Sequence, residues 1–176
     1  MASDWDSLSE AMARLQSTSC YIDDTGGVTV SEMRTKLRRL KLELGRLDLV
    51  VIDYLQLMSY TGKSENRVQI VAEITRSLKM LARELDVPVV LLSQLSRAPE
   101  QRTDHRPMMS DLRESGSIEQ DADVIVMLYR PAVYDPTAGN EAVAIVAKHR
   151  NGPTGDVELI WNGSITSYQN VSDRQS

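Results

Sequence analysis

Two short apolar runs, separated by a long amphipathic segment, most constrain how this chain can fold. The runs are 49–52 and 87–92, and both lack the polar alternation of a strand with one solvated face. Between them, 67–86 carries apolar side chains at helical spacing: Val71, Ile74, Leu78, Leu81 and Leu85. The order strand, helix, strand predicts a βαβ unit with two parallel strands, each buried on both faces.

Polar side chains follow both predicted strands. Asp53 comes directly after the first run, and Gln94 lies just beyond the second. Parallel strands end at one edge of a sheet, where open α/β folds bind ligands, so the two groups are expected to meet there. A carboxylate at that edge can orient hydrated magnesium, and a glutamine can contact a terminal phosphate or a catalytic water. From local sequence alone, a turn-capping Asp53 and an ordinary loop Gln94 stay open.

The N-terminal part predicts two helices and a short strand. Residues 4–16 have amphipathic helical spacing, and 19–22 is a strand candidate. Thr29 and Glu32 form a capping-box signature for a second helix, which Gly45 closes. We interpret the cations of that helix as a solvated face, with a partner or DNA surface as the alternative. They are Arg34, Lys36, Arg38, Arg39 and Lys41.

The C-terminal half predicts an irregular helix-loop-helix followed by strands. Within 110–123, Gly116 would let backbone amides approach a ligand, and amides beside Arg113 could bind successive phosphates of a single strand. An ordinary polar connection is the alternative. The expected strands are 124–129, 141–147, 156–161 and 165–168.

The hairpin between 141–147 and 156–161 carries two cations, Lys148 and Arg150. Their alternate spacing predicts that both point to one side of the strand end. They are either solvated or able to reach a phosphate held by a neighbouring subunit, as an arginine finger does.

Composition excludes several classes of protein. With a net charge of −5, any nucleic-acid contact must be local. A single cysteine excludes an internal disulfide, and two histidines and one cysteine exclude a transition-metal cluster of the usual spacing. No apolar run approaches the ~18 residues of a membrane span, and the N-terminus has no signal-peptide pattern. We therefore expect a cytoplasmic protein without membrane contact.

Taken in order, these motifs resemble the bacterial replicative DNA helicase DnaB family. The blocks that carry the resemblance are VVIDYLQLM, VVLLSQLSR, DLRESGSIEQDADVIVMLYR and AKHRNGPTG. The resemblance implies an α/β fold: a partial RecA-like P-loop NTPase core, with a parallel sheet flanked by helices and an antiparallel hairpin at the C-terminal side. Residues 1–170 would form this C-terminal part of a DnaB-type helicase domain, and 171–176 a polar tail.

The resemblance also implies roles at an ATP site. Asp53 matches the Walker B aspartate, which orients Mg2+ at the phosphates of ATP. Gln94 matches the glutamine thought to sense the γ-phosphate. Lys148 and Arg150 match the basic pair that reaches into the ATP site of the neighbouring subunit.

For DNA, the resemblance implies that Arg113, Glu114 and Gly116 belong to the loop that holds the backbone of single-stranded DNA. Six subunits of the family form a ring that hydrolyses ATP, moves along one strand and unwinds the duplex. Primase and a helicase loader are the further partners that the resemblance implies.

One departure from the family pattern limits what the chain is expected to do. No G-x-x-x-x-G-K-[ST] motif occurs, because the Gly62-Lys63-Ser64 triplet has Leu57 where the first glycine is required. We interpret this triplet as part of a channel loop. The family's P-loop would precede the first helix, so we expect a truncated chain, inactive alone, that exposes one apolar side of its sheet.

Two other functions compete with this interpretation. A recombinase or circadian-type RecA-like ATPase shares the fold, but the DLRESGSIEQDADV and KHRNGPTG blocks favour DnaB. A non-catalytic remnant that binds single-stranded DNA or helicase subunits also fits, because the P-loop motif is missing. A phage-encoded helicase of the same family would look the same.

Overall fold

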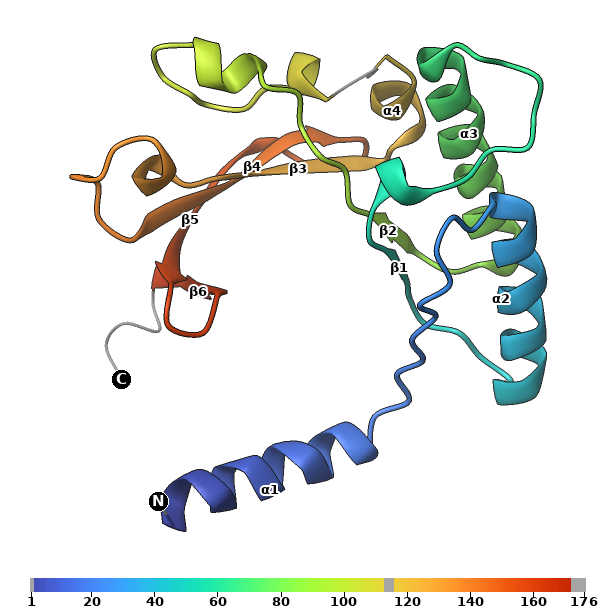
Figure 1. Cartoon of the computed structure of the whole chain (residues 1–176), viewed down its shortest axis with the longest axis horizontal. Coiled ribbons are helices and arrows are strands. Elements are labelled where there is room, and N and C mark those ends of the chain that lie inside the picture. Colours follow the sequence, from blue (N-terminus) through green and yellow to red (C-terminus); the bar gives the residue numbers. More distant parts are fainter. Residues whose placement is uncertain (1, 113–115, 172–176) are drawn as a thin grey trace.

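The computed structural model describes residues 2–112 and 116–171 (Figure 1). Its helices are α1 (Ala2–Gln16), α2 (Val30–Leu44), α3 (Arg67–Leu85) and α4 (Gly116–Asp121). Its strands are β1 (Val50–Ile52), β2 (Val89–Leu91), β3 (Val124–Tyr129), β4 (Glu141–His149), β5 (Gly155–Asn162) and β6 (Ser167–Asn170). Short 3-10 turns cover Leu55–Leu57, Ala98–Gln101, Met109–Asp111 and Pro131–Val133. The predicted α/β class is confirmed.

The predicted βαβ unit is present. β1 and β2 pair in parallel, from Val50 opposite Val89 to Ile52 opposite Leu91. α3 crosses between them and buries the predicted apolar side chains, and α2 lies beside α3 on the same side of these strands (Figure 1). α3 ends at Asp86, whose backbone takes the left-handed conformation. The core therefore forms between the two helices and one face of β1 and β2.

The expectation that these strands are buried on both faces is wrong. Val50 and Ile52 are buried, but Val51 is 58% exposed and Val90 of β2 is 48% exposed. Val126 of β3 also points outward, while Met127 beside it is buried. Burial therefore alternates although the side chains are apolar on both faces. This confirms the expected exposed apolar side of the sheet.

The third strand joins a different sheet from β1 and β2. β3, β4, β5 and β6 form an antiparallel sheet in that order, with a register shift between Ile125 and Val126. Trp161 of β5 stacks under the Arg130 guanidinium, whose carbon lies 3.7 Å from the ring centre. The edge of Tyr168 contacts the same indole at a centroid distance of 4.9 Å. These contacts hold β6 against β5 beside the end of β3.

The strand predicted at 19–22 is wrong. This segment has no strand partner in the described chain, and Ile22 is 89% exposed. A single extended segment cannot pair its own backbone groups, so a short run of strand-forming residues does not suffice. α1 forms as predicted and lies apart from the two sheets (Figure 1). None of the helices in the described ranges is long and apolar enough to cross a membrane.

Both predicted caps of α2 are confirmed. The Glu32 amide donates to Thr29 Oγ1 at 3.3 Å, and the Thr29 amide donates to Glu32 Oε2 at 2.9 Å. Gly45 ends the helix at φ 76°, a conformation that glycine adopts without strain.

The cations of α2 are only partly a solvated face. Arg34 and Arg38 both pair with Glu84, at 3.3 Å and 2.6 Å. Lys41 Nζ donates to the carbonyl of Leu85, at the end of α3. A cation beside the last carbonyls of a helix is stabilised by the helix dipole, so these residues join α2 to α3.

Candidate functional site

Asp53 and Gln94 lie at the same edge of the parallel pair. Ile52 lies opposite Leu91, so the chain leaves both strands side by side. The hydrogen bond from the Leu92 amide to the carbonyl of Ile52, 3.0 Å, continues the pairing into the loops. Both predicted side chains are exposed at this edge. The structure therefore brings a carboxylate and a carboxamide to the place expected for ligands.

Gln56 connects the two loops at this edge. Its Nε2 donates to Ser93 Oγ and to the carbonyl of Gln94, both at 3.2 Å. Its Oε1 accepts from the Gln94 amide, also at 3.2 Å. The position of Gln94 therefore depends on a side chain that follows Asp53 by three residues. Sequence reasoning missed this role, although Gln56 is the polar side chain in an apolar segment.

Asp53 could hold a hydrated magnesium ion by accepting hydrogen bonds from its water ligands. Its carboxylate is exposed at the end of a strand, which suits a metal that keeps most of its water ligands. Among the described residues, no three histidine, cysteine, aspartate or glutamate side chains gather closely enough to hold a metal ion. The donor set of this chain therefore fits one side of a hydrated Mg2+ site.

A buried ion pair organises the loop after β2. Asp111 is 1% exposed, and Arg102 donates to both of its carboxylate oxygens, with Nη1 at 2.7 Å from Oδ1. The Met108 amide donates to Oδ2 at 2.7 Å. The Arg102 hydrogen bond holds the pKa of Asp111 below its ordinary value, and the same bond raises the pKa of Arg102. Asp111 is therefore ionised in the folded protein.

Asp111 also connects the candidate phosphate-sensing loop to the candidate DNA loop. Its carbonyl accepts from the Ser96 amide at 2.8 Å, and Leu95 forms a bridge with Leu112. Leu112 directly precedes the predicted DNA residues Arg113 and Glu114, which lie outside the described residues. The backbone beyond Gln94 is thus hydrogen-bonded to the backbone that directly precedes the predicted DNA residues.

Gly116, the third predicted DNA residue, is the first residue of α4. α4 is fixed to α3 by buried Ile118 and by a hydrogen bond from Thr75 Oγ1 to Asp121 Oδ2, 2.7 Å long. This predicted DNA residue therefore lies at the start of a helix that is held against α3.

Lys148 and Arg150 point to one side of the strand end, as predicted. Lys148 Nζ donates to the carbonyl of Glu119, and Arg150 Nη2 donates to the carbonyl of Gln120 at 3.3 Å. Both acceptors are near the C-terminal end of α4. Arg150 also forms an ion pair with Asp123 at 3.3 Å.

These two cations are separated from Gln94 by the length of β3. Lys148 pairs with Ile125 near the start of β3, whereas Gln94 shares a cavity with Tyr129 and Arg130 at its end. The six residues of β3 span about 17 Å at the usual rise of a strand. Within one chain, the structure therefore does not bring the predicted finger residues to the Gln94 edge.

The sequence profile of the DnaB-like helicase C terminal domain matches residues 1–170. The chain belongs to this family. It is 54% identical to the replicative DNA helicase DnaB of Geobacillus stearothermophilus over 174 residues, 97% of this chain. It is 53% identical to the replicative DNA helicase DnaC of Bacillus subtilis, again over 97% of this chain. The match spans 38% of the length of each of these relatives.

Two solved structures resemble this DnaB-like chain with a TM-score of 0.90 and 44% identity over 96% of its length. One is the ATPase domain of another protein, and 60% of that domain is covered. The other is a DnaB-like replicative helicase studied in its interactions with primase, of which 42% is covered. The fold and the family resemblance inferred from the sequence are confirmed.

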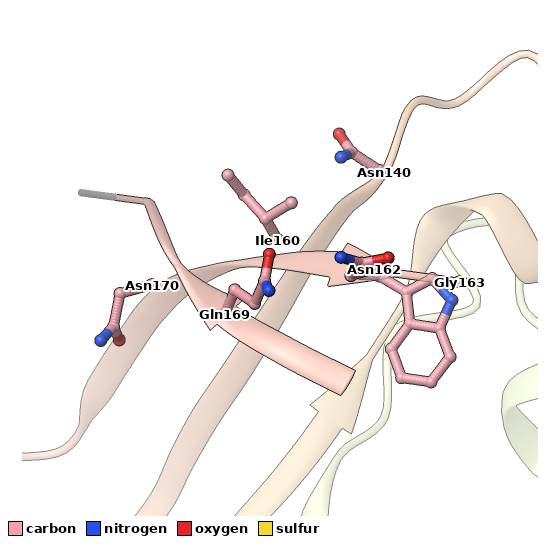
Figure 2. Close-up of a pocket in the computed structure, with 7 residues that line it drawn as sticks. Asn140, Ile160, Asn162, Gly163, Gln169 and Asn170 are labelled. Carbon is pink, nitrogen blue, oxygen red and sulfur yellow. The ribbon is translucent and has the colours of Figure 1, made fainter. Parts of the chain in front are cut away.

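Two cavities of about 370 Å³ each lie among the described residues of the DnaB-like chain. The cavity beside Gln94 is lined in part by His105 and Tyr134, whose ring centroids stack 4.3 Å apart. The other lies between β5, β6 and Asn140 (Figure 2). Carboxamides and an indole line it: Asn140, Asn162, Gln169, Asn170 and Trp161. No predicted site residue lines this second cavity, and nothing in the sequence indicated it.

Proposed function

We propose that this chain is the part of a replicative, ATP-dependent DNA helicase that contacts single-stranded DNA and the neighbouring subunit. The complete protein would translocate on one DNA strand as a hexameric ring and unwind the duplex. One observation carries the proposal: Lys148 and Arg150 lie at the opposite end of β3 from Gln94. A phosphate site that uses both sets needs two copies, with each copy supplying its cations to the next.

Each residue at the sheet edge has a role in this proposal. Asp53 would accept hydrogen bonds from the water ligands of Mg2+ and so hold the ion at the edge. Gln94, with its backbone held by Gln56, contacts the terminal phosphate or the attacking water. When bound, Mg2+ would neutralise charge that develops on the phosphates of ATP. Lys148 and Arg150 of the adjacent copy would stabilise the same charge from the other side.

The proposed DNA role belongs to the segment between Leu112 and α4, together with the first residue of α4. Backbone amides near Gly116, together with Arg113, would hold successive phosphates of one strand without reading bases. The hydrogen bond between Ser96 and Asp111 would transmit a shift of the Gln94 loop to this segment. Primase and a helicase loader are proposed partners of the complete protein.

Binding of labelled oligo-dT, measured by fluorescence anisotropy at several salt concentrations, tests the DNA role. Arg113→Ala is expected to weaken binding and to lower the slope of log affinity against log salt by roughly one phosphate contact. Arg46→Ala is the matched control, because Arg46 is an exposed cation paired with Asp48. Equal effects of the two substitutions, or no binding by the wild-type chain, would contradict the proposal.

A second candidate function is a non-catalytic remnant that binds DNA or helicase subunits. The missing G-x-x-x-x-G-K-[ST] motif favours it, because the phosphates of ATP would lack the backbone amides and the lysine that this motif supplies. Under either function, the purified chain is expected to show no significant ATP hydrolysis. Restored DNA-stimulated hydrolysis when the motif-bearing segment of a DnaB relative is added in front would favour the helicase.

A further inference from the structure

Lys148 and Arg150 are held by the same short structural unit. Both donate to carbonyls near the end of α4, and the Arg150 amide also donates to the carbonyl of Asp123 at 2.8 Å. The Asp123 carboxylate pairs with Arg150 Nη1 at 3.3 Å. Two kinds of acceptor therefore act on the two cationic groups, helix carbonyls and a carboxylate, while the Asp123 carbonyl fixes the backbone of Arg150.

Asp123 is itself anchored to α3. Lys79 Nζ donates to its Oδ2, and this hydrogen bond holds the pKa of Asp123 below its ordinary value. The charge of Arg150 lowers the same pKa further. Asp123 is therefore an anion at neutral pH, held between a cation of the core helix and a cation of the hairpin.

The helix end that receives the cations is equally well anchored. Thr75, four residues before Lys79 on α3, donates to Asp121 at 2.7 Å. Residues four apart lie on one face of a helix, so a single face of α3 holds both Asp121 and Asp123. Because the apolar face of α3 is buried in the core, Asp121 and Asp123 are held in a fixed position relative to β1 and β2.

We propose that Asp123 is a positioning residue for Lys148 and Arg150. Together with the last carbonyls of α4, it sets the direction in which the two side chains leave the sheet. That the two cations reach the phosphate site of a neighbouring copy rests on the proposed function. The contacts that hold them within this chain do not depend on it. Since α4 begins at Gly116, this predicted DNA residue and the two cations lie at opposite ends of one six-residue helix.

Side-chain reactivity in the full 176-residue chain tests this proposal. The rate of acetylation of Lys148 and the rate of dicarbonyl modification of Arg150 are measured by mass spectrometry, with exposed Lys63 as internal reference. Asp123→Asn is expected to raise the Arg150 rate about two- to fivefold, as for loss of a partly exposed ion pair, and the Lys148 rate in the same direction. The Lys63 rate stays unchanged.

Two further variants separate positioning from general loosening. Asp123→Glu retains the charge and is expected to return both rates towards wild type, while the thermal midpoints of the two Asp123 variants remain alike. Asp135→Asn removes a carboxylate that caps Thr137 in a distant loop, and it leaves both rates unchanged.

Equal rates in wild type and Asp123→Asn would overturn the proposal, as would failure of Asp123→Glu to restore them. Neither DNA nor nucleotide takes part in this labelling. A negative labelling result therefore does not contradict the proposed function, which the oligo-dT experiment tests. Likewise, a chain that does not bind oligo-dT would not contradict the positioning role of Asp123.

Discussion

Replacing Asp111 by asparagine should be among the most destabilising single-atom changes in this chain. The substitution keeps the size of the side chain but removes its charge and replaces one acceptor oxygen by a donor. The single carboxamide oxygen cannot accept from all three donors: placed at the Oδ2 position it serves Arg102 Nη2 and the Met108 amide, but the NH2 group then faces Arg102 Nη1. A buried polar group then loses its partner, and Arg102 loses its buried, directly hydrogen-bonded counter-ion.

The magnitude follows from the burial of the pair. Breaking a buried ion pair by removing one partner costs about 3–5 kcal/mol. The Arg102 side chain is 27% exposed and can be hydrated in the variant, which places the expected loss at about 3 kcal/mol. For a domain of this size, that corresponds to a thermal midpoint lower by about 6–12 °C.

Urea unfolding followed by circular dichroism measures this loss, and Asp104→Asn is its control. Asp104 faces the same guanidinium at 3.8 Å, but its side chain is 63% exposed. An exposed pair of this kind contributes about 0–1 kcal/mol, so the control should remain close to wild type. Losses of the same size in the two variants would refute the assignment of stability to the buried pair.

The pH dependence provides an independent check of the same pair. The folded-state pKa of Asp111 lies below the ordinary 3.8, so the unfolded chain binds the proton more readily. The stabilisation is fully present above the unfolded pKa and is lost as pH falls through the folded pKa. The difference between wild type and Asp111→Asn should therefore be constant near neutral pH and shrink below about pH 4.

Three further predictions concern the fold. Leu81→Ala, at a fully buried position of α3, should lower the free energy of unfolding by about 3 kcal/mol, whereas Leu42→Ala, at an exposed position of α2, should stay within about 0.5 kcal/mol in the same urea assay. Thr29→Ala removes the α2 cap and should lower the free energy of unfolding by about 1 kcal/mol. An unchanged free energy would show that another acceptor takes the place of Thr29 Oγ1 at the Glu32 amide. Val126→Lys, on the exposed apolar side of β3, should reduce binding of the dye ANS and self-association in sedimentation, and unchanged values would mean that this side is already covered.

Features set by neighbours in the sequence could be predicted well. The caps at Thr29 and Gly45 depend on residues within one turn of the helix, and both are present. The βαβ order also followed from local patterns, because a helix between two apolar runs allows only a parallel pair. The common direction of Lys148 and Arg150 followed from the period of a strand.

Features set by distant partners could not be predicted. Arg102 and Asp111 are nine residues apart in a loop, and no periodic pattern distinguishes them from other charged loop residues. Val51 carries the same apolar side chain whether or not its face is covered, so composition could not tell that it is exposed. The segment 19–22 has strand-like residues, but whether it pairs depends on a partner strand, which local sequence does not specify.

The surroundings of the two tryptophans decide what intrinsic fluorescence can report. Trp5 of α1 is 70% exposed, so its emission is already that of a hydrated indole and changes little on unfolding. Trp161 is held between Arg130 and Tyr168 on the antiparallel sheet, and its surroundings are lost when β5 and β6 separate. A fluorescence titration of the wild-type chain thus follows the C-terminal sheet, while circular dichroism follows mainly the helices. Comparing the two signals would reveal whether the chain melts as one cooperative unit or as two.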